Sequence, residues 1–489
     1  MKKIIIIINS LLVILSTSCS DEFLNNENKE YVSMEQILTL AESSPEALLI
    51  VTNGVLGGQY SFMREYNTWT PGNGRHDDFG QKAVDLGLDL MSNDMVQVRS
   101  HWFIHYYNYV SRTEPASNTH TIWNFYYRII YGVSLNINII PEDTDDKNLQ
   151  YSLGRSLALR AFSYFNLVRI YQNTYINNQN EPGVMISTGK TFDPQPRSSV
   201  DSVYRVILSD LSRAHTLLDG YERTSKSEID QKIVAGLLSR VYLERQEWGL
   251  AAQYANEARQ GETIMSKEDW MAGFTDINNE EWMWGADINS ETATTYASYY
   301  SHIANLSPGY AGALGIYKSI DKRLYDSIPI TDVRKSAFAG ASDASLPMYA
   351  NKKFYDRTFF EGDYVYMRSS ELYLNEAEAL AEGGNDVEAQ DLLFEFVSVR
   401  DSGYVKSSRT GDALVEEIRL QRRIELWGEG FAWFDMKRWG VPLQRDYNGS
   451  NHTAQGLLNI EAEADEFRFQ LPEDEMKINT VLTDSDQNP

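Results

Sequence analysis

Aromatic side chains outside the regular helical patterns are the residues of this sequence best suited to binding a ligand. The chain contains 30 Tyr and 10 Trp. A sugar ring stacks its flat C–H face on an aromatic ring, while its hydroxyl groups need polar partners. Core packing and contact with a partner protein are the alternative roles for such residues. We predict ligand contact for five aromatics in loops or polar segments: Trp69, Trp102, Tyr296, Tyr299 and Tyr300.

Patterns for metal binding or catalysis are weak in comparison. His101 and His105 are four residues apart and could share a helical face, but the segment HWFIH lacks the adjacent glutamate of a zinc protease. Ordinary helical histidines are the simpler interpretation. No serine-hydrolase, zinc-protease or P-loop motif occurs. We predict no enzymatic activity, metal or cofactor. A surface glycosidase stays an alternative, because its two carboxylates are defined by distance in space.

The charge of the chain limits the partners that it can bind. It carries 69 acidic and 44 basic residues, which gives a formal net charge of −25. A chain this acidic repels the phosphate backbone of nucleic acids and the surface of anionic lipids. We therefore predict that the protein binds no nucleic acid.

The first nineteen residues have the pattern of a bacterial lipoprotein leader. Lys2 and Lys3 precede an apolar stretch at 4–15, small residues follow, and the only cysteine of the chain is Cys19. The stretch is too short for a transmembrane helix, which favours a secretory signal. We predict a signal peptide at 1–18, lipidation of Cys19 and a flexible tether at 19–30. A plain signal peptide with a chance cysteine is the alternative.

Apolar residues repeat at helical spacing through most of the chain. Residues 153–171 and 200–218 each form one apolar helical face. Residues 233–259 and 371–400 each combine two such helices around a short break, near 246–249 in the first and at Gly383-Gly384 in the second. These two units resemble tetratricopeptide helix pairs, which stack because a single pair cannot bury its faces. We predict a mostly α fold, a tetratricopeptide-like array of four imperfect helix pairs.

The predicted array is interrupted by residues 261–360, where helical periodicity is weak. The segment is rich in Gly, Ser, Asn and Tyr, and Trp282 and Trp284 lie in an alternating stretch that predicts a strand. We predict an irregular, loop-rich insertion that carries short strands. In this plan residues 31–260 form an N-terminal helical region, and residues 261–489 form a C-terminal region.

The segment at 422–440, RRIELWGEGFAWFDMKRWG, combines an apolar stripe with charges of both signs. The stripe predicts one helical face formed by Ile424, Trp427, Phe431 and Phe434. Seven charged residues surround this face, and we expect them to form ion pairs on the helix surface without contacting a ligand. They are Arg422, Arg423, Glu425, Glu429, Asp435, Lys437 and Arg438.

Several segments in order resemble the SusD/RagB family. Residues 155–172, RSLALRAFSYFNLVRIYQ, resemble the family pattern LRAxxYFxLVRxYG, with Gln172 in place of the usual glycine. Residues 422–440 resemble RRxELxxEGxRxxDLxRWG, and residues 366–384 resemble the family segment that contains AExYLxyAEA. The tail at 467–489 resembles fPIPxxEixxNpxLxQNPGY but lacks the final Gly-Tyr. The resemblance covers nearly the whole chain after the leader.

This resemblance implies a nutrient-binding protein on the cell surface. Family membership implies a lipid anchor in the outer membrane, an extracellular position and a SusC-like TonB-dependent transporter as partner. The protein would capture an oligosaccharide or polysaccharide as a hinged lid and deliver it to that transporter. The acidic Asp21-Glu22 after Cys19 also resembles the export signal of Bacteroidetes surface lipoproteins. A lid that binds peptides or glycoproteins, and a scaffold that binds only proteins, remain alternatives.

Overall fold

The computed structural model describes residues 34–69, 74–187, 189 and 193–489. The predicted leader, Cys19 and the tether lie outside these residues. The described chain is about half helical, with eighteen α-helices and six short strands, which confirms the predicted fold class. The described residues fall into two compact units that divide after Val51, and α3 (Met34–Ser43) and the start of α4 (Pro45–Phe62) belong to the first. No described helix is both long and apolar enough to span a bilayer.

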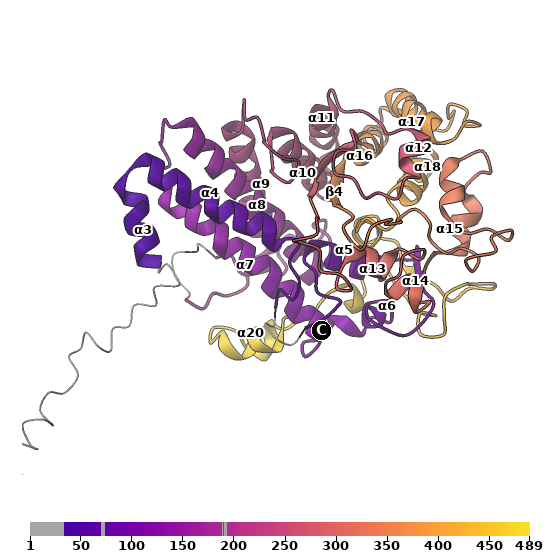
Figure 1. Ribbon diagram of the computed structural model, residues 1–489, viewed down its shortest axis with the longest axis horizontal. Coiled ribbons are helices and arrows are strands. Elements are labelled where there is room, and N and C mark those ends of the chain that lie inside the picture. Colours follow the sequence, from indigo (N-terminus) through magenta and orange to yellow (C-terminus); the bar gives the residue numbers. More distant parts are fainter. Residues whose placement is uncertain (1–33, 70–73, 188, 190–192) are drawn as a thin grey trace, which may run out of the picture. The chain divides into compact units, whose positions relative to one another are not determined.

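Long helices packed side by side form the N-terminal half of the second unit (Figure 1). Helix α8 packs against α7 and α9, and α10 packs against α11. Polar side chains begin several of them, as Asp146 accepts hydrogen bonds from two backbone amides at the start of α8. The break predicted near 246–249 separates α10 from α11. The bounds are α7 Ser117–Ile139, α8 Lys147–Tyr171, α9 Val200–Leu217, α10 Gln231–Glu244 and α11 Trp248–Arg259.

A second group of packed helices follows near the C-terminus. Helix α16 packs against α11, α17 and α18. The turn between α16 and α17 contains Gly384, whose φ of 80° is a left-handed conformation that glycine adopts without strain. Ala377, Leu393 and Ile418 are fully or almost fully buried in the core between these helices. The bounds are α16 Ser369–Glu382, α17 Asp386–Arg400, α18 Asp412–Glu425 and α19 Ala432–Arg438.

Short strands join segments that are distant in the sequence. Strand β1 pairs antiparallel with β3, β2 with β4, and β5 with β6. The predicted strand around Trp282 and Trp284 is β2. Because β1 pairs with β3, the loop that follows Gln97 lies beside the middle of the 261–360 segment. The bounds are β1 Met95–Gln97, β2 Trp282–Ala286, β3 Lys318–Ile320, β4 Tyr364–Arg368, β5 Leu443–Gln444 and β6 Asn459–Ile460.

Short helices fill the spaces around these strands. Helix α6 packs against β1 and α5, α13 packs against α5 and α14, and α20 belongs to the C-terminal tail (Figure 1). The bounds are α5 Gln81–Asp89, α6 Ile104–Tyr107, α12 Lys267–Trp270, α13 Tyr299–Ile303, α14 Tyr310–Ala313, α15 Lys322–Ser327 and α20 Glu473–Ile478.

The charged segment at 422–440 differs from its prediction in two respects. It is not one helix, because Gly428 and Gly430 adopt φ values of 82° and 96° and separate α18 from α19. Its charges are also not on the surface. Glu425 and Glu429 are buried, and their carboxylates pair with cations from other elements. The prediction of surface ion pairs is therefore wrong for most of this segment.

These buried charges form what we call the core ion network. Glu425 pairs with Arg334 at 3.2 Å, with Arg368 at 2.7 Å and with Arg400 at 3.3 Å. Glu281 pairs with Arg368 and Arg400, and Glu429 with Arg368 and Lys353. The side chains of the network are at most 3% exposed. The network joins α17, α18, β4 and Glu281, the residue before β2. Because its members are buried, the loss of any one partner would be costly.

Candidate functional site

Aromatic residues from three separate segments meet at the surface of the second unit. The His76 ring stacks on Trp102 at a centroid distance of 5.9 Å and lies 5.6 Å from Tyr310. Tyr310 also contacts His101 at 4.9 Å and Tyr296 at 6.1 Å. We call His76, His101, Trp102, Tyr296 and Tyr310 the aromatic cluster. It unites the predicted Trp102 and Tyr296, which are almost 200 positions apart in the chain.

Backbone pairing and short hydrogen-bonded turns hold the cluster in place. Gln97, at the end of β1, donates through its amide to the carbonyl oxygens of Arg99 and Trp102 at 3.0 and 3.1 Å. The hydroxyl group of Tyr310 is hydrogen-bonded to His76 Nδ1 at 2.6 Å. These contacts fix both rings relative to the β1–β3 pair. The arrangement is therefore preformed rather than dependent on ligand.

The aromatic cluster has accessible ring surface. Tyr296 is 45% exposed, and Phe359 beside it is 56% exposed. Trp102 and Tyr310 are half-buried, which leaves part of each ring open while the rest is packed. Exposed aromatic faces anchored from behind are what stacking on a sugar ring requires, because the rings lose little freedom on binding.

Polar groups lie at the edge of the aromatic cluster. The Arg75 guanidinium is 5.6 Å from the Trp102 ring centre, and its Nη2 donates to Asp77 at 2.7 Å. Arg99 is exposed and donates to the Leu314 carbonyl at 3.1 Å. Guanidinium groups have five N–H donors, so both residues retain donors for sugar hydroxyls.

A buried histidine and a buried lysine support the aromatic cluster from below. His302 is 1% exposed, stacks on Tyr310 at 4.8 Å, and is hydrogen-bonded through Nε2 to the His76 carbonyl at 2.7 Å. Burial, assisted by the charge of Lys318, lowers the pKa of His302 well below its ordinary value. Burial also lowers the pKa of Lys318 to about 7. The His302 imidazole, which stacks on Tyr310, is therefore uncharged at neutral pH.

Replacing Lys318 by methionine is expected to stabilise the protein at neutral pH. The ammonium group is fully buried, donates to the Ile316 carbonyl at 3.3 Å, and has no ion pair with a described carboxylate. Between pH 7 and 10.5 the unfolded chain binds more protons than the folded one, so the free energy of unfolding of the wild type rises with pH there. Lys318→Met removes this penalty and should add up to about 4 kcal/mol at pH 7.

Urea unfolding at several pH values between 6 and 10 measures this effect. The gain from Lys318→Met should shrink steadily as the pH rises above 7. Lys352→Met, which replaces a partly exposed lysine paired with Asp343 at 3.1 Å, is the control and should leave the pH slope unchanged. A Lys318→Met protein that is less stable than the wild type at pH 7 would contradict the prediction.

Tyr299 and Tyr300 do not belong to the accessible surface. Both are 1% exposed, and their hydroxyl groups donate to backbone carbonyls of Gly428 and Phe274. They lie on α13, whose residues are all buried. The polar composition of the surrounding segment suggested an exposed loop, but the segment folds back on itself and packs these rings inside. We therefore remove both from the candidate ligand contacts.

Trp69 lies apart from the aromatic cluster. Its half-buried ring stacks on His120 of α7 at 5.0 Å, and its backbone amide donates to Asp78 at 3.2 Å. Burial raises the pKa of the Asp78 carboxyl to about 6. Contact between Trp69 and a ligand stays a prediction, at a location different from that of Trp102.

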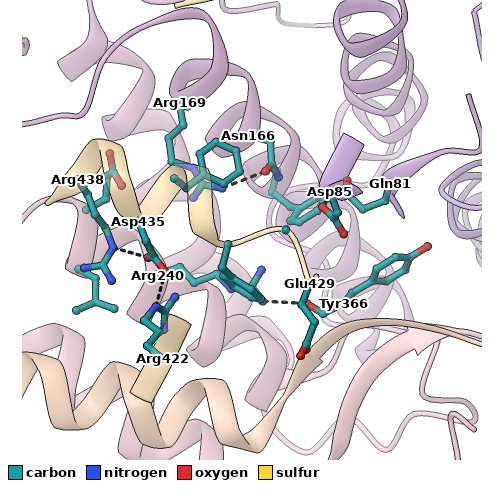
Figure 2. Close-up of a pocket in the computed structure, with 16 residues that line it drawn as sticks. Gln81, Asp85, Asn166, Arg169, Arg240, Tyr366, Arg422, Glu429, Asp435 and Arg438 are labelled. Carbon is teal, nitrogen blue, oxygen red and sulfur yellow. Dashed lines mark hydrogen bonds and ion pairs between the residues drawn. The ribbon is translucent and has the colours of Figure 1, made fainter. Parts of the chain in front are cut away.

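A small pocket lined by charges lies between α8, α10 and α19 (Figure 2). Its volume is about 50 Å³. Figure 2 shows Arg422 and Arg438 converging on Asp435, and Arg169 bonded to Asn166. A cavity of this size holds a few water molecules, whereas ligand pockets measure roughly 300–1,000 Å³. The cavity is therefore too small for a saccharide, and its Arg240, Arg422, Arg438, Glu429 and Asp435 form ion pairs within the fold.

Among the described residues, no group of three or more His, Cys, Asp or Glu side chains is arranged to hold a metal ion. His101 contacts Tyr310 and precedes α6, while His105 lies on α6.

His76, Tyr310 and Phe359 were not predicted as site residues. They become part of the aromatic surface only through tertiary contacts.

Two family models match the chain. Residues 340–489 match the SusD family, and residues 79–243 match a family described as starch-binding and associating with the outer membrane. A SusD-like protein of Formosa agariphila is 25% identical, with 67% of this chain and 73% of the relative covered. A SusD-like protein of Bacteroides ovatus is 22% identical, with 74% and 72% covered.

Solved structures share the fold. A SusD-like carbohydrate-binding protein of Bacteroides vulgatus has a TM-score of 0.78 at 24% identity, covering 90% of this chain and 98% of that one. A laminarin-binding SusD-like protein has a TM-score of 0.65 at 19% identity, with 90% and 98% covered. The chain therefore belongs to the SusD/RagB family.

Proposed function

We propose that this protein captures an oligosaccharide at the aromatic cluster and delivers it to a SusC-like TonB-dependent transporter. The observation that carries the proposal is the preformed ring surface of Trp102, Tyr296 and Tyr310, with Arg75 and Arg99 at its edge. Rings bind the apolar sugar faces, and the guanidinium groups donate to hydroxyls. A laminarin-binding protein among the structural neighbours supports a glycan as the ligand.

In this proposal the protein binds its ligand and catalyses no reaction on it. Members of the family are binding proteins, and the aromatic cluster presents rings, imidazoles and guanidinium groups rather than a pair of opposed carboxylates. Energy for transport would come from the transporter, and this protein would supply affinity and closure. Peptide ligands remain the alternative, because aromatic rings and guanidinium groups also bind peptides.

Calorimetric titration of the purified protein with a glycan panel that includes laminarin tests this function, with each hit analysed for hydrolysis products. We expect saturable binding without turnover. Steady hydrolysis would identify an enzyme instead. Binding of peptides but of no glycan would replace the proposed ligand class.

The partner is tested by gentle purification from outer membranes. A tagged copy of this protein should recover a barrel protein of the TonB-dependent class in mild detergent. Absence of any barrel from preparations that retain other membrane complexes would oppose the proposed delivery step.

Replacing Cys19 by alanine should release the protein from the membrane. A lipidated cysteine anchors through acyl chains that contribute about 0.8 kcal/mol per buried CH₂ group. We expect Cys19→Ala to lose labelling by a fatty-acid probe and to leave the membrane fraction. Ser18→Ala is the control, because a small residue before the cysteine is kept. A Cys19→Ala protein that still carries label would refute the proposed anchor.

Replacing Tyr299 by phenylalanine separates core aromatics from ligand-binding ones. The change removes a buried hydroxyl that donates to the Gly428 carbonyl, which should cost about 1 kcal/mol of stability. Glycan affinity should stay at the wild-type value, whereas Tyr296→Ala should lower it. Thermal unfolding and calorimetry measure the two effects. Loss of affinity in Tyr299→Phe without loss of stability would return Tyr299 to the binding site.

A further inference from the structure

The loop that joins β5 to β6 contains an exposed turn with the sequence Asn448-Gly449. The backbone amide of Ser450 donates to the Tyr447 carbonyl at 3.1 Å, which makes Asn448 and Gly449 the two central residues of a β-turn. Both residues are exposed, and Gly449 has a φ of 82°. A β-carbon at Gly449 would meet no atom within 4 Å, so the turn projects into open space. We call Tyr447–Ser450 the Asn-Gly turn.

An asparagine that is followed by glycine can react with its own backbone. The deprotonated amide nitrogen of the glycine attacks the side-chain carbon Cγ of the asparagine, the Cγ–Nδ2 bond breaks, and the side-chain nitrogen leaves as ammonia. Water then opens the resulting succinimide ring at either carbonyl, which gives aspartate or isoaspartate. Glycine favours the attack because it has no β-carbon to hinder ring closure and little restriction on its backbone. The reaction consumes only water and needs no enzyme.

The two reacting groups of the Asn-Gly turn are unconstrained. Among the described residues, neither the Asn448 side chain nor the Gly449 amide has a hydrogen-bond partner. The peptide between them can therefore rotate toward the geometry of attack without breaking any hydrogen bond except the turn bond from Ser450 to Tyr447. Thermolability of asparagine is expected where the chain has this freedom.

The pair Asn53-Gly54 provides an internal comparison, because the same two residues lie there in a protected setting. The pair is in the interior of α4, where backbone amides donate along the helix. Asn53 Oδ1 also accepts hydrogen bonds from Arg155 at 2.8 Å and from Ser152 at 3.1 Å. Attack at Asn53 requires α4 to open locally and both side-chain bonds to break. The remaining Asn-Gly pair of the chain begins at Asn73, which lies outside the described residues.

Hydrogen bonds on both sides of the Asn-Gly turn keep a change at the turn local. The Tyr447 hydroxyl donates to Asp321 at 2.8 Å. On the other side, the Asn451 side chain accepts from the Lys322 amide at 2.9 Å and donates to the Ile320 carbonyl at 2.9 Å. These bonds join the loop to β3 and to the start of α15. Isoaspartate lengthens the backbone by a methylene group, and the flanking bonds confine this distortion to the turn.

We propose that Asn448 is a site of spontaneous deamidation, and that the native fold directs the reaction to this residue in preference to Asn53. Each event replaces a neutral amide by a carboxylate, which adds a negative charge to a loop that already carries the exposed Asp446. The protein would therefore accumulate more acidic but still folded forms as it ages. The proposal rests on the Asn-Gly turn and is independent of the proposed capture function.

Peptide mapping of the purified protein during incubation tests this proposal. The folded protein is kept at pH 8 and at pH 5, because attack requires deprotonation of the glycine amide. Trypsin cleaves after Lys and Arg, so Asn448 falls in the peptide 446–468 and Asn53 in the peptide 30–64. Fragment-ion mass spectrometry locates the residue at which NH₂ has been replaced by OH and separates aspartate from isoaspartate. A digest at time zero corrects for reaction during digestion.

Two variants and an unfolded sample serve as controls. Asn448→Gln blocks the reaction, because the longer side chain has to close a larger and less favourable ring. Asn180→Gln is the matched control, at an exposed asparagine in a turn that is followed by Glu181 in place of glycine. Protein unfolded in guanidinium chloride removes the protection that α4 gives to Asn53.

In the folded protein, Asn448 should react at least about tenfold faster than Asn53, because reaction at Asn53 waits for local opening of α4. The rate at Asn448 should be higher at pH 8 than at pH 5, and both product isomers should appear. The peptide 446–468 should stay unmodified in Asn448→Gln and react as in the wild type in Asn180→Gln. In guanidinium chloride Asn448 and Asn53 should react at similar rates.

Three results would overturn the proposal. The first is equal rates at Asn448 and Asn53 in the folded protein. The second is an Asn448 that stays intact in the folded protein and reacts only after unfolding. The third is modification of the peptide 446–468 at the wild-type rate in Asn448→Gln, which would assign the reaction to Asn451 or Asn459. None of these results bears on glycan binding, so the capture function would be left as it stands.

Discussion

Replacing Glu425 by alanine is expected to destabilise the protein by at least about 4 kcal/mol. Glu425 is fully buried and accepts hydrogen bonds from Arg368, Arg400 and Arg334 as well as from the Trp270 indole at 3.0 Å. Without its carboxylate, three guanidinium groups would share too few acceptors in a region closed to water. Burial alone would raise the pKa of the Glu425 carboxyl, but the charges of Arg400, Arg368 and Arg334 hold it well below its usual value.

This loss would be a large fraction of the 5–15 kcal/mol that typically separates folded from unfolded domains. Denaturant unfolding followed by circular dichroism measures it, and a failure to accumulate folded protein is the extreme form of the same result. Glu416→Ala is the matched control on the same helix. Its side chain is 70% exposed and pairs with Arg419 at 2.9 Å, so its loss should cost less than about 1 kcal/mol. Equal effects of the two substitutions would contradict the assigned role of the core ion network.

Replacing Trp102 by alanine is expected to weaken glycan binding by about thirtyfold. Truncation of a tryptophan at the centre of a binding surface typically costs about 2 kcal/mol, which corresponds to that change in Kd. Trp102 is stacked on His76 and faces the Arg75 guanidinium, so its ring is oriented before ligand arrives. The carbonyl of Trp102 keeps its bond from Gln97 in the variant, which preserves the backbone of the loop.

Calorimetry with the tightest glycan of the panel measures this change in Kd. Phe394→Ala, which removes an exposed ring on α17 stacked on Tyr404, is the control and should bind as the wild type does. Thermal unfolding must show that Trp102→Ala remains folded. A folded variant with unchanged affinity for every glycan would remove Trp102 from the proposed site and with it the main support for the aromatic cluster as the capture surface.

The helical framework was predictable because its signals are local. The break near 246–249, the turn at Gly383 and Gly384, and the strand around Trp282 all appear in the structure, since each depends on a few adjacent residues. The charged segment at 422–440 was not predictable in the same way. A helical stripe with flanking charges resembles a surface helix. Only tertiary contacts show that Glu425 meets cations that are supplied 25 to 91 positions earlier in the chain.

Prediction of the candidate site is limited in the same way, because the exposure of a ring depends on tertiary contacts. Trp102 and Tyr296 were selected because they lie off the helical stripes, and they share the aromatic cluster. Tyr299 and Tyr300 were selected by the same rule and are buried. Tyr296 is exposed, whereas Tyr299, three residues later, is buried, because α13 begins at Tyr299 and its residues lie inside the protein. Composition identifies a segment that can bind, but the start of a short helix decides which ring faces solvent.

The tail of the chain carries a consequence for how the protein is made. The backbone amide of Phe469 donates to the Ile170 carbonyl at 3.0 Å, and Asn488 donates to the carbonyls of Tyr171 and Phe469. The end of α8 is thus completed by residues synthesised about 300 positions later. Contacts of such long sequence separation form late, because closing a long loop costs entropy before any contact is gained. We expect a chain emerging from the ribosome to remain incompletely folded until its last residues have been synthesised.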